Sequence, residues 1–115
     1  MRSSYEGIGQ WAATFACGTV AEGEMVKISA NGTVSACERD DGFCGMVLAV
    51  SRGGDACTVV LGGMVTAGYS GDTAPTVGWV NLAADGRGGV TASAAGRSYL
   101  AVDVDTSAET VTFIL

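Results

Sequence analysis

The sequence predicts an all-β protein, a small antiparallel barrel or sandwich of about ten short strands. Apolar and polar residues alternate along several segments, and a period of two is typical of a strand with one buried face. Glycine is abundant, at 18 of 115 residues, and it separates the alternating segments as tight turns do. No segment has a convincing helical pattern. A barrel or sandwich is favoured because a single flat sheet would leave its edges unpaired.

Residues 1–16 are expected to hold a flexible arm, 1–10, and the start of the first strand, Trp11–Cys17. A single all-β domain then covers residues 17–115. Asn31-Gly32 predicts a hairpin with a type I′ turn, because both central residues of that turn need positive φ. The remaining strands are expected at 24–30, 33–37, 45–51, 55–62, 64–69, 77–84, 90–93 and twice within 97–115, where residues 106–108 form the turn.

The pattern of the C-terminal strands occurs earlier at a fixed offset of 54 residues. The matched residues, each set expected to lie on a buried face, are Met46, Leu48, Val50, Cys57, Val59 and Leu61 in the first copy and Leu100, Val102, Val104, Val111, Phe113 and Leu115 in the second. The copies span about 21–63 and 76–115, with residues 70–75 as the expected linker. This pattern indicates a tandem duplication of a four-strand unit. The alternative is that two unrelated β-meanders share it.

Charge and hydrophobicity exclude several classes of protein. The net charge is −6 and the six basic residues are scattered, so no basic patch is present to bind nucleic acid. No apolar run is long enough to span a membrane. The N-terminus lacks the apolar core of a signal peptide, so we expect synthesis in the cytoplasm without export.

Catalytic chemistry is not expected, and neither is a cofactor. The chain has no histidine, which removes the commonest general base and every Ser-His-Asp or Cys-His set. Asp103 and Asp105 share one strand face and could hold a cation together with Asp40 or Asp41. The alternative is that these carboxylates are simply solvated, as residues 38–41 are also expected to be.

The four cysteines lack the paired spacing of a zinc site. The alternation places Cys57 with Val59, and Cys17 with Phe15, as small buried apolar residues. Cys37 and Cys44 flank the acidic loop and could form a disulfide if oxidised, although a cytoplasmic origin argues against it. Free thiols, one disulfide and a metal site all remain open at this point.

Four aromatic residues are candidates for a protein interface: Tyr5, Trp11, Phe15 and Trp79. Trp79 is out of phase with the apolar residues of its strand and shares the polar face with Asn81. It either lies under the N-terminal segment or contacts another chain, because exposed tryptophan is enriched at interfaces. Trp11 and Phe15 could instead pack in the core, and Tyr5 could dock on a neighbour.

Four stretches together resemble a known family: GEMVKISANGTV, FCGMV, TVVLGG and GRSYLAVDVDTSAETVTFIL. Over residues 18–115 the chain is similar to the small phage capsid cement, or head decoration, proteins. The resemblance implies an all-β protein on the exterior of a virion. Such a protein binds the major capsid protein, often as a trimer at threefold positions, and has no catalytic residues. It also implies that an N-terminal arm, here residues 1–10, contacts the shell. It gives no role to the cysteines.

Two functions follow as expectations. The first is a virion structural protein that reinforces a capsid and binds neither nucleic acid nor membrane. The second is a carbohydrate-binding or head-fibre adhesion module, for which Trp79 and Asn81 offer the only pair of an aromatic ring and an amide on one strand face.

Overall fold

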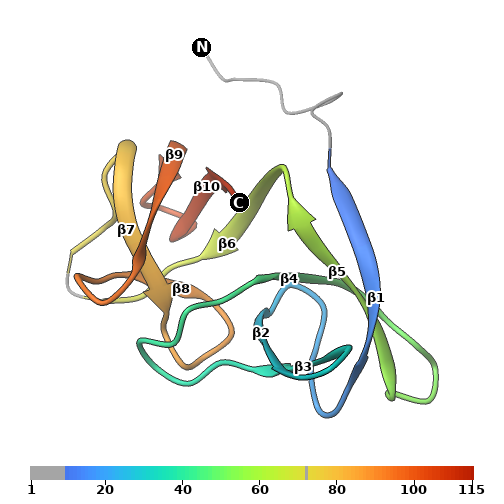
Figure 1. Cartoon of the computed structure of the whole chain (residues 1–115). Coiled ribbons are helices and arrows are strands. Elements are labelled where there is room, and N and C mark those ends of the chain that lie inside the picture. The colour runs from blue at the N-terminus through green and yellow to red at the C-terminus, as the bar shows by residue number, and fades with distance from the viewer. Residues whose placement is uncertain (1–9, 72) are drawn as a thin grey trace.

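The computed structural model describes residues 10–71 and 73–115 and confirms an all-β protein (Figure 1). The described residues form ten strands and no helix. The strands are β1 (Trp11–Cys17), β2 (Met25–Ala30), β3 (Thr33–Ala36), β4 (Gly45–Val50), β5 (Ala56–Gly62), β6 (Met64–Gly68), β7 (Gly78–Ala84), β8 (Val90–Ala92), β9 (Arg97–Asp105) and β10 (Thr110–Ile114). Residues 1–9, which include Tyr5 and the expected arm, lie outside this description.

The ten strands form two units with the same strand order. In the first unit the bonded neighbours run β1-β5-β4-β2-β3, and in the second they run β6-β10-β9-β7-β8. A parallel pairing of β1 with β3, which includes Cys17 and Val34, closes the first unit into a barrel. The matching contact in the second unit is a single parallel bridge between Tyr69 and Val90, and that sheet stays open.

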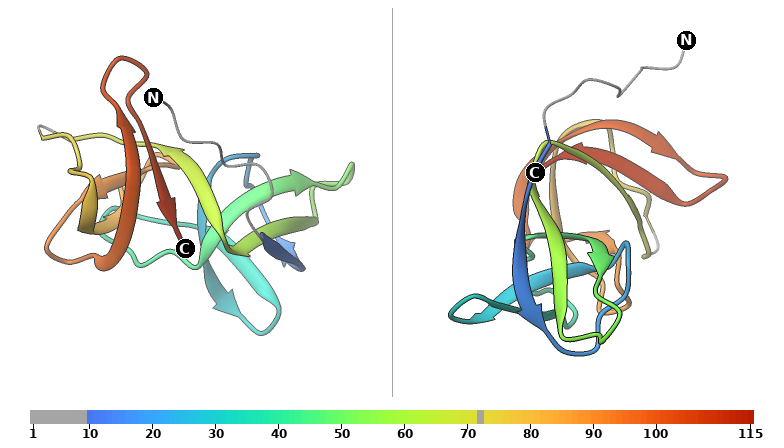
Figure 2. Two further views of the ribbon diagram at one scale, coloured as in Figure 1. Left: turned by 90° about the horizontal axis from the view of Figure 1, so that it is seen from above. Right: turned by 90° about the vertical axis from the view of Figure 1, so that its right-hand side faces the viewer.

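This topology agrees with the offset of 54 residues, but the repeated unit has five strands rather than four. The chain passes from one unit to the other at Gly63, because Met64–Gly68 pairs with β10 of the second sheet. Residues 70–75 therefore connect β6 to β7 inside the second unit, and do not separate the copies. Figure 2 shows the β9–β10 hairpin of this second unit projecting from the body in both views.

Both units contain a β-bulge at the same relative position. The pairing of β4 with β5 shifts register at Leu48, and the pairing of β9 with β10 shifts at Val102, 54 residues later. A bulge adds one unpaired residue to a strand and reverses the alternation beyond it. The expected buried faces of β4 and β9 are therefore wrong in phase: Gly45 and Val47 are buried while Leu48 is exposed, and Tyr99 and Ala101 are buried while Leu100 is not.

The core is divided between the units in an unequal way. The first barrel is filled by its own residues, chiefly Val26, Val34, Val47, Cys57 and Val59. The open second sheet packs its inner face against residues of the first unit as well as its own. This second core contains Val65, Ala67, Leu82, Ala84, Val90, Tyr99, Ala101, Val111 and Phe113 together with Met25, Phe43 and Val60 of the first unit.

Two local expectations need correction. The hairpin at Asn31-Gly32 is present, but of these two residues only Gly32 has positive φ, so the turn is not type I′. The acidic loop 38–42 is not simply solvated, because it joins the two units. Asp40 N donates to Ala84 O, Ala84 N donates to Asp41 O, and the Asp41 carboxylate accepts a 2.6 Å bond from Lys27 Nζ.

Candidate functional site

A row of apolar side chains crosses the outer face of the second sheet. Pairing places Trp79 of β7 opposite Leu100 of β9, Leu100 opposite Ile114 of β10, and Ile114 opposite Met64 of β6. Directly paired residues point to the same face of a sheet, so these four form one continuous line, called here the apolar row. The Trp79 side chain is 74 % exposed and Ile114 is 37 % exposed.

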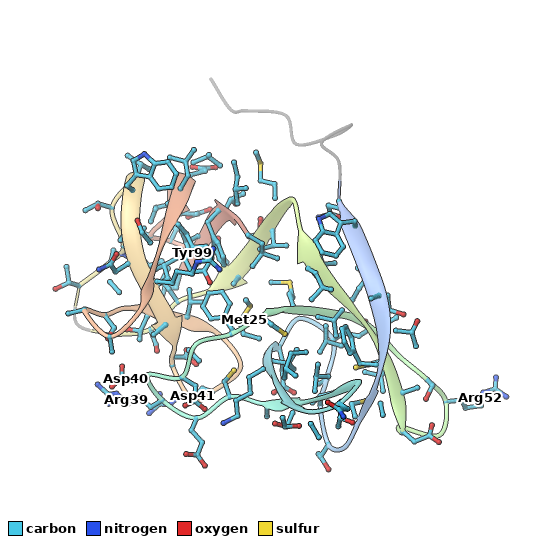
Figure 3. All side chains as sticks on the ribbon, in the orientation of Figure 1. Met25, Arg39, Asp40, Asp41, Arg52 and Tyr99 are labelled. Carbon is cyan, nitrogen blue, oxygen red and sulfur yellow. The ribbon has the colours of Figure 1, made fainter. Side chains whose placement is uncertain are left out.

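The same row exists in the first unit, where it is covered. Met25, Met46, Val60 and Ala12 occupy the equivalent positions and pair in the same order. Met25 and Val60 are almost fully buried, because the second sheet packs over them. Figure 3 shows Met25 between the two units. No described segment covers the apolar row in this way, so it has the position of a packing surface without its partner.

Polar residues border the apolar row on both sides. Along the strands, Asn81 and Ser98 form the next pair in one direction. In the other direction, Thr66 and Thr112 are paired and their hydroxyl oxygens lie 2.8 Å apart. An apolar centre with a polar rim is the usual composition of a protein interface.

A hollow of about 220 Å³ lies beside the apolar row, near the end of β10. Its apolar lining includes Trp79, Leu100, Ile114 and Leu115. The only charged side chain among its described lining residues is Arg97, whose guanidinium carbon is 5.8 Å from the centre of the Tyr99 ring. The hollow therefore suits an apolar side chain with a carboxylate next to it.

The N-terminal end of the described chain also lies beside the apolar row. Gln10 Nε2 donates a 2.6 Å hydrogen bond to the carbonyl oxygen of Met64. Trp11 pairs with Gly62, and its indole occupies the space that a Gly62 side chain would take. Leu115 N donates to Gly63 O, so the C-terminus is held at the same place.

The aromatic candidates lie in different surroundings. Trp79 belongs to the apolar row. Trp11 is 62 % exposed, because a register shift between Trp11 and Ala12 turns it away from the barrel core, whereas Phe15 packs against that core. Tyr5 lies outside the described residues. Sequence reasoning missed Leu100, Ile114 and Met64, and the offset of 54 would have found Leu100 and Ile114 once Met46 and Val60 were known to be covered.

No metal site is assembled in residues 10–71 and 73–115, where no three Cys, Asp or Glu side chains gather closely enough to hold an ion. The expected cation group of Asp103 and Asp105 with Asp40 or Asp41 does not form. Asp40 accepts the hydroxyl of Ser93, and Asp105 Oδ1 accepts the backbone N–H groups of Ser107 and Ala108 in its own turn.

All four cysteines are free thiols. Cys57 is buried in the barrel core with Cys17 packed against that core. Burial, together with a side-chain hydrogen bond with Cys17, raises the pKa of the Cys57 thiol from 9.0 to about 11. Burial and the nearby Asp41 carboxylate raise the pKa of Cys37 to about 11, and burial also raises the pKa of Cys44. These thiols are therefore protonated and weakly nucleophilic at neutral pH.

The raised thiol pKa values predict a loss of stability in alkali. A thiol whose pKa is higher in the folded chain than in the unfolded chain stabilises the fold below the unfolded value, and that contribution disappears as pH rises through the folded value. We expect the free energy of unfolding in reducing buffer to fall from pH 9 towards pH 11. Urea unfolding across this range measures it. Cys57→Val, which installs the residue of the equivalent position Val111, should reduce the fall, and an unchanged slope would contradict the assignment to Cys57.

Searches against protein families and against curated proteins find no match to the sequence. The described residues contain no helix of the length and hydrophobicity that crossing a membrane requires.

Proposed function

We propose that the chain is a virion structural protein that binds the outer surface of a phage capsid and stabilises it, as decoration or cement proteins do. The observation that carries the proposal is the apolar row, which is open in the second unit although its counterpart in the first unit is covered. The resemblance of residues 18–115 to cement proteins indicates the kind of partner, a major capsid protein.

The composition of the surface supports a role in protein binding. Trp79 offers a large rigid ring at one end of the apolar row, and truncating such a residue at an interface typically costs about 2 kcal/mol or more. A capsid repeats one surface many times, so contacts between neighbouring copies and the shell add to each other through high effective concentration. We further propose that the chain assembles as a homotrimer on the capsid exterior, without nucleic acid or membrane partners.

Co-sedimentation with expanded capsids of the phage that encodes the chain tests this proposal. The wild-type chain should sediment with the capsids. Trp79→Ala should weaken binding by about 30-fold, the factor that corresponds to about 2 kcal/mol. Stability of the free chain should change little, because the ring is largely exposed. Leu48→Ala is the matched control, since Leu48 is an exposed apolar residue of β4 outside the apolar row.

Two outcomes would overturn the proposal. If the wild-type chain stays in the supernatant with intact expanded capsids, the chain is not a decoration protein. If Leu48→Ala and Trp79→Ala weaken binding equally, the apolar row is not the contact surface.

A carbohydrate-binding module is the second candidate. Trp79 and Asn81 are both exposed on one face of β7, and an aromatic ring beside an amide is suited to stack on and hydrogen-bond a sugar. A glycan array separates the candidates, because the capsid proposal expects no glycan to bind.

A further inference from the structure

We propose that residues 1–9 of the chain cover the apolar row in the free protein, with Tyr5 beside Trp79. The segment must then leave the row before a capsid can bind there, and this last step rests on the function proposed above.

The first argument is where the described chain begins. The Gln10 side chain is bonded to the carbonyl oxygen of Met64, which is the end member of the apolar row. The chain before Gln10 therefore starts next to the row, and it does not have to travel around the molecule to reach it.

The second argument is length. Neighbouring strands lie about 4.8 Å apart, so the four strands of the apolar row extend over about 14 Å from Met64 to Trp79. Nine extended residues span about 30 Å. Counted back from Gln10, Ile8 can reach about 7 Å and Tyr5 about 16 Å. These distances allow Ile8 to lie over Ile114 and Tyr5 to lie at Trp79.

The third argument is chemistry. Met1, Tyr5 and Ile8 are the large apolar residues of the segment, and Gly7 and Gly9 let its backbone approach a surface closely. Glu6 follows Tyr5 directly. The hollow at Trp79 is lined by apolar side chains and by Arg97, with no carboxylate side chain among its described lining residues. An aromatic ring in this hollow with a carboxylate facing Arg97 matches both its shape and its charge.

Fluorine NMR of the free protein tests the proposal without capsids, so its failure is distinct from failure of the proposed function. The chain has two tryptophans, and 5-fluorotryptophan gives one signal for each, assigned with Trp79→Phe. Deletion of residues 2–9 should shift the Trp79 signal and increase its solvent isotope shift. The double variant Tyr5→Ser/Ile8→Ser, which keeps the length, should do the same, and Ser3→Ala/Ser4→Ala should leave the signal unchanged.

The covering segment must also belong to the same chain. Labelled chain lacking residues 2–9 is mixed with an excess of unlabelled full-length chain. The Trp79 signal should not change, because the missing segment cannot be replaced by a neighbour. A return of the full-length signal in the mixture would assign the cover to a second chain. Equal solvent exposure of Trp79 in the full-length and shortened chains would show that no segment covers it. Either result overturns the proposal.

Discussion

Replacing Gly45 with alanine should destabilise the protein by about 4 kcal/mol, near the upper end for one substitution. An added Cβ would lie closer to the Val60 carbonyl oxygen than any real contact allows, and 2.8 Å from Val59 Cγ1. The oxygen is part of the β5 backbone, so β4 and β5 would have to separate and break the barrel wall. Small domains are stable by about 5–15 kcal/mol, and little folded protein should therefore remain under mild urea. The midpoint of urea unfolding measures the loss.

Gly42→Ala is the matched control for this substitution. Gly42 has no atom within 4 Å of an added Cβ and does not require positive φ. Its replacement should change stability by less than about 0.5 kcal/mol. Equal unfolding midpoints for the two variants would mean that β4 does not approach β5 as closely as the structure places it.

Phe113→Ala should cost about 3–5 kcal/mol, the usual loss for a buried phenylalanine. Phe113 is fully buried in the second core. Its ring centre lies 5.9 Å from that of Phe43 and 5.4 Å from that of Tyr99, and Phe43 and Tyr99 stack on each other at 5.1 Å. Removing it empties the centre of a three-ring cluster that joins the units. Urea unfolding gives the free energy, and near-ultraviolet circular dichroism reports the loss of ring packing.

Ile114→Ala provides the comparison, because Ile114 is the next residue on the opposite, partly exposed face of β10. Its loss should be about 1 kcal/mol, since less apolar surface is buried there. A larger loss for Ile114 than for Phe113 would mean that β10 presents the opposite face to the core.

The strands could be predicted almost to the residue, whereas the buried faces could not. Trp11–Cys17 has the expected bounds, and Met25–Ala30 and Gly45–Val50 differ by one residue. Alternation and glycine turns are local properties, so one sequence is enough to locate them. The bulges at Leu48 and Val102 have no local mark in the sequence. Because each bulge reverses the phase of its strand, Leu100 was expected inside and lies on the outer face.

The candidate surface was predictable only in part for the same reason. Trp79 could be found because it is out of phase with Val80 and Leu82 in a strand without a bulge. Ile114 and Met64 could not be joined to it, because the neighbours of a strand depend on pairing over long sequence separations. That pairing also places Met64 in the second sheet rather than the first.

The unequal division of the core has a consequence for how the chain is made. The first unit encloses its own interior, while the second needs Met25, Phe43 and Val60 of the first to complete its packing. Ribosomes deliver the N-terminal half first, and domains commonly fold as they emerge. The nascent barrel is thus available as a template when the later strands leave the exit tunnel, so the order of synthesis matches the order in which the two halves can acquire stable structure.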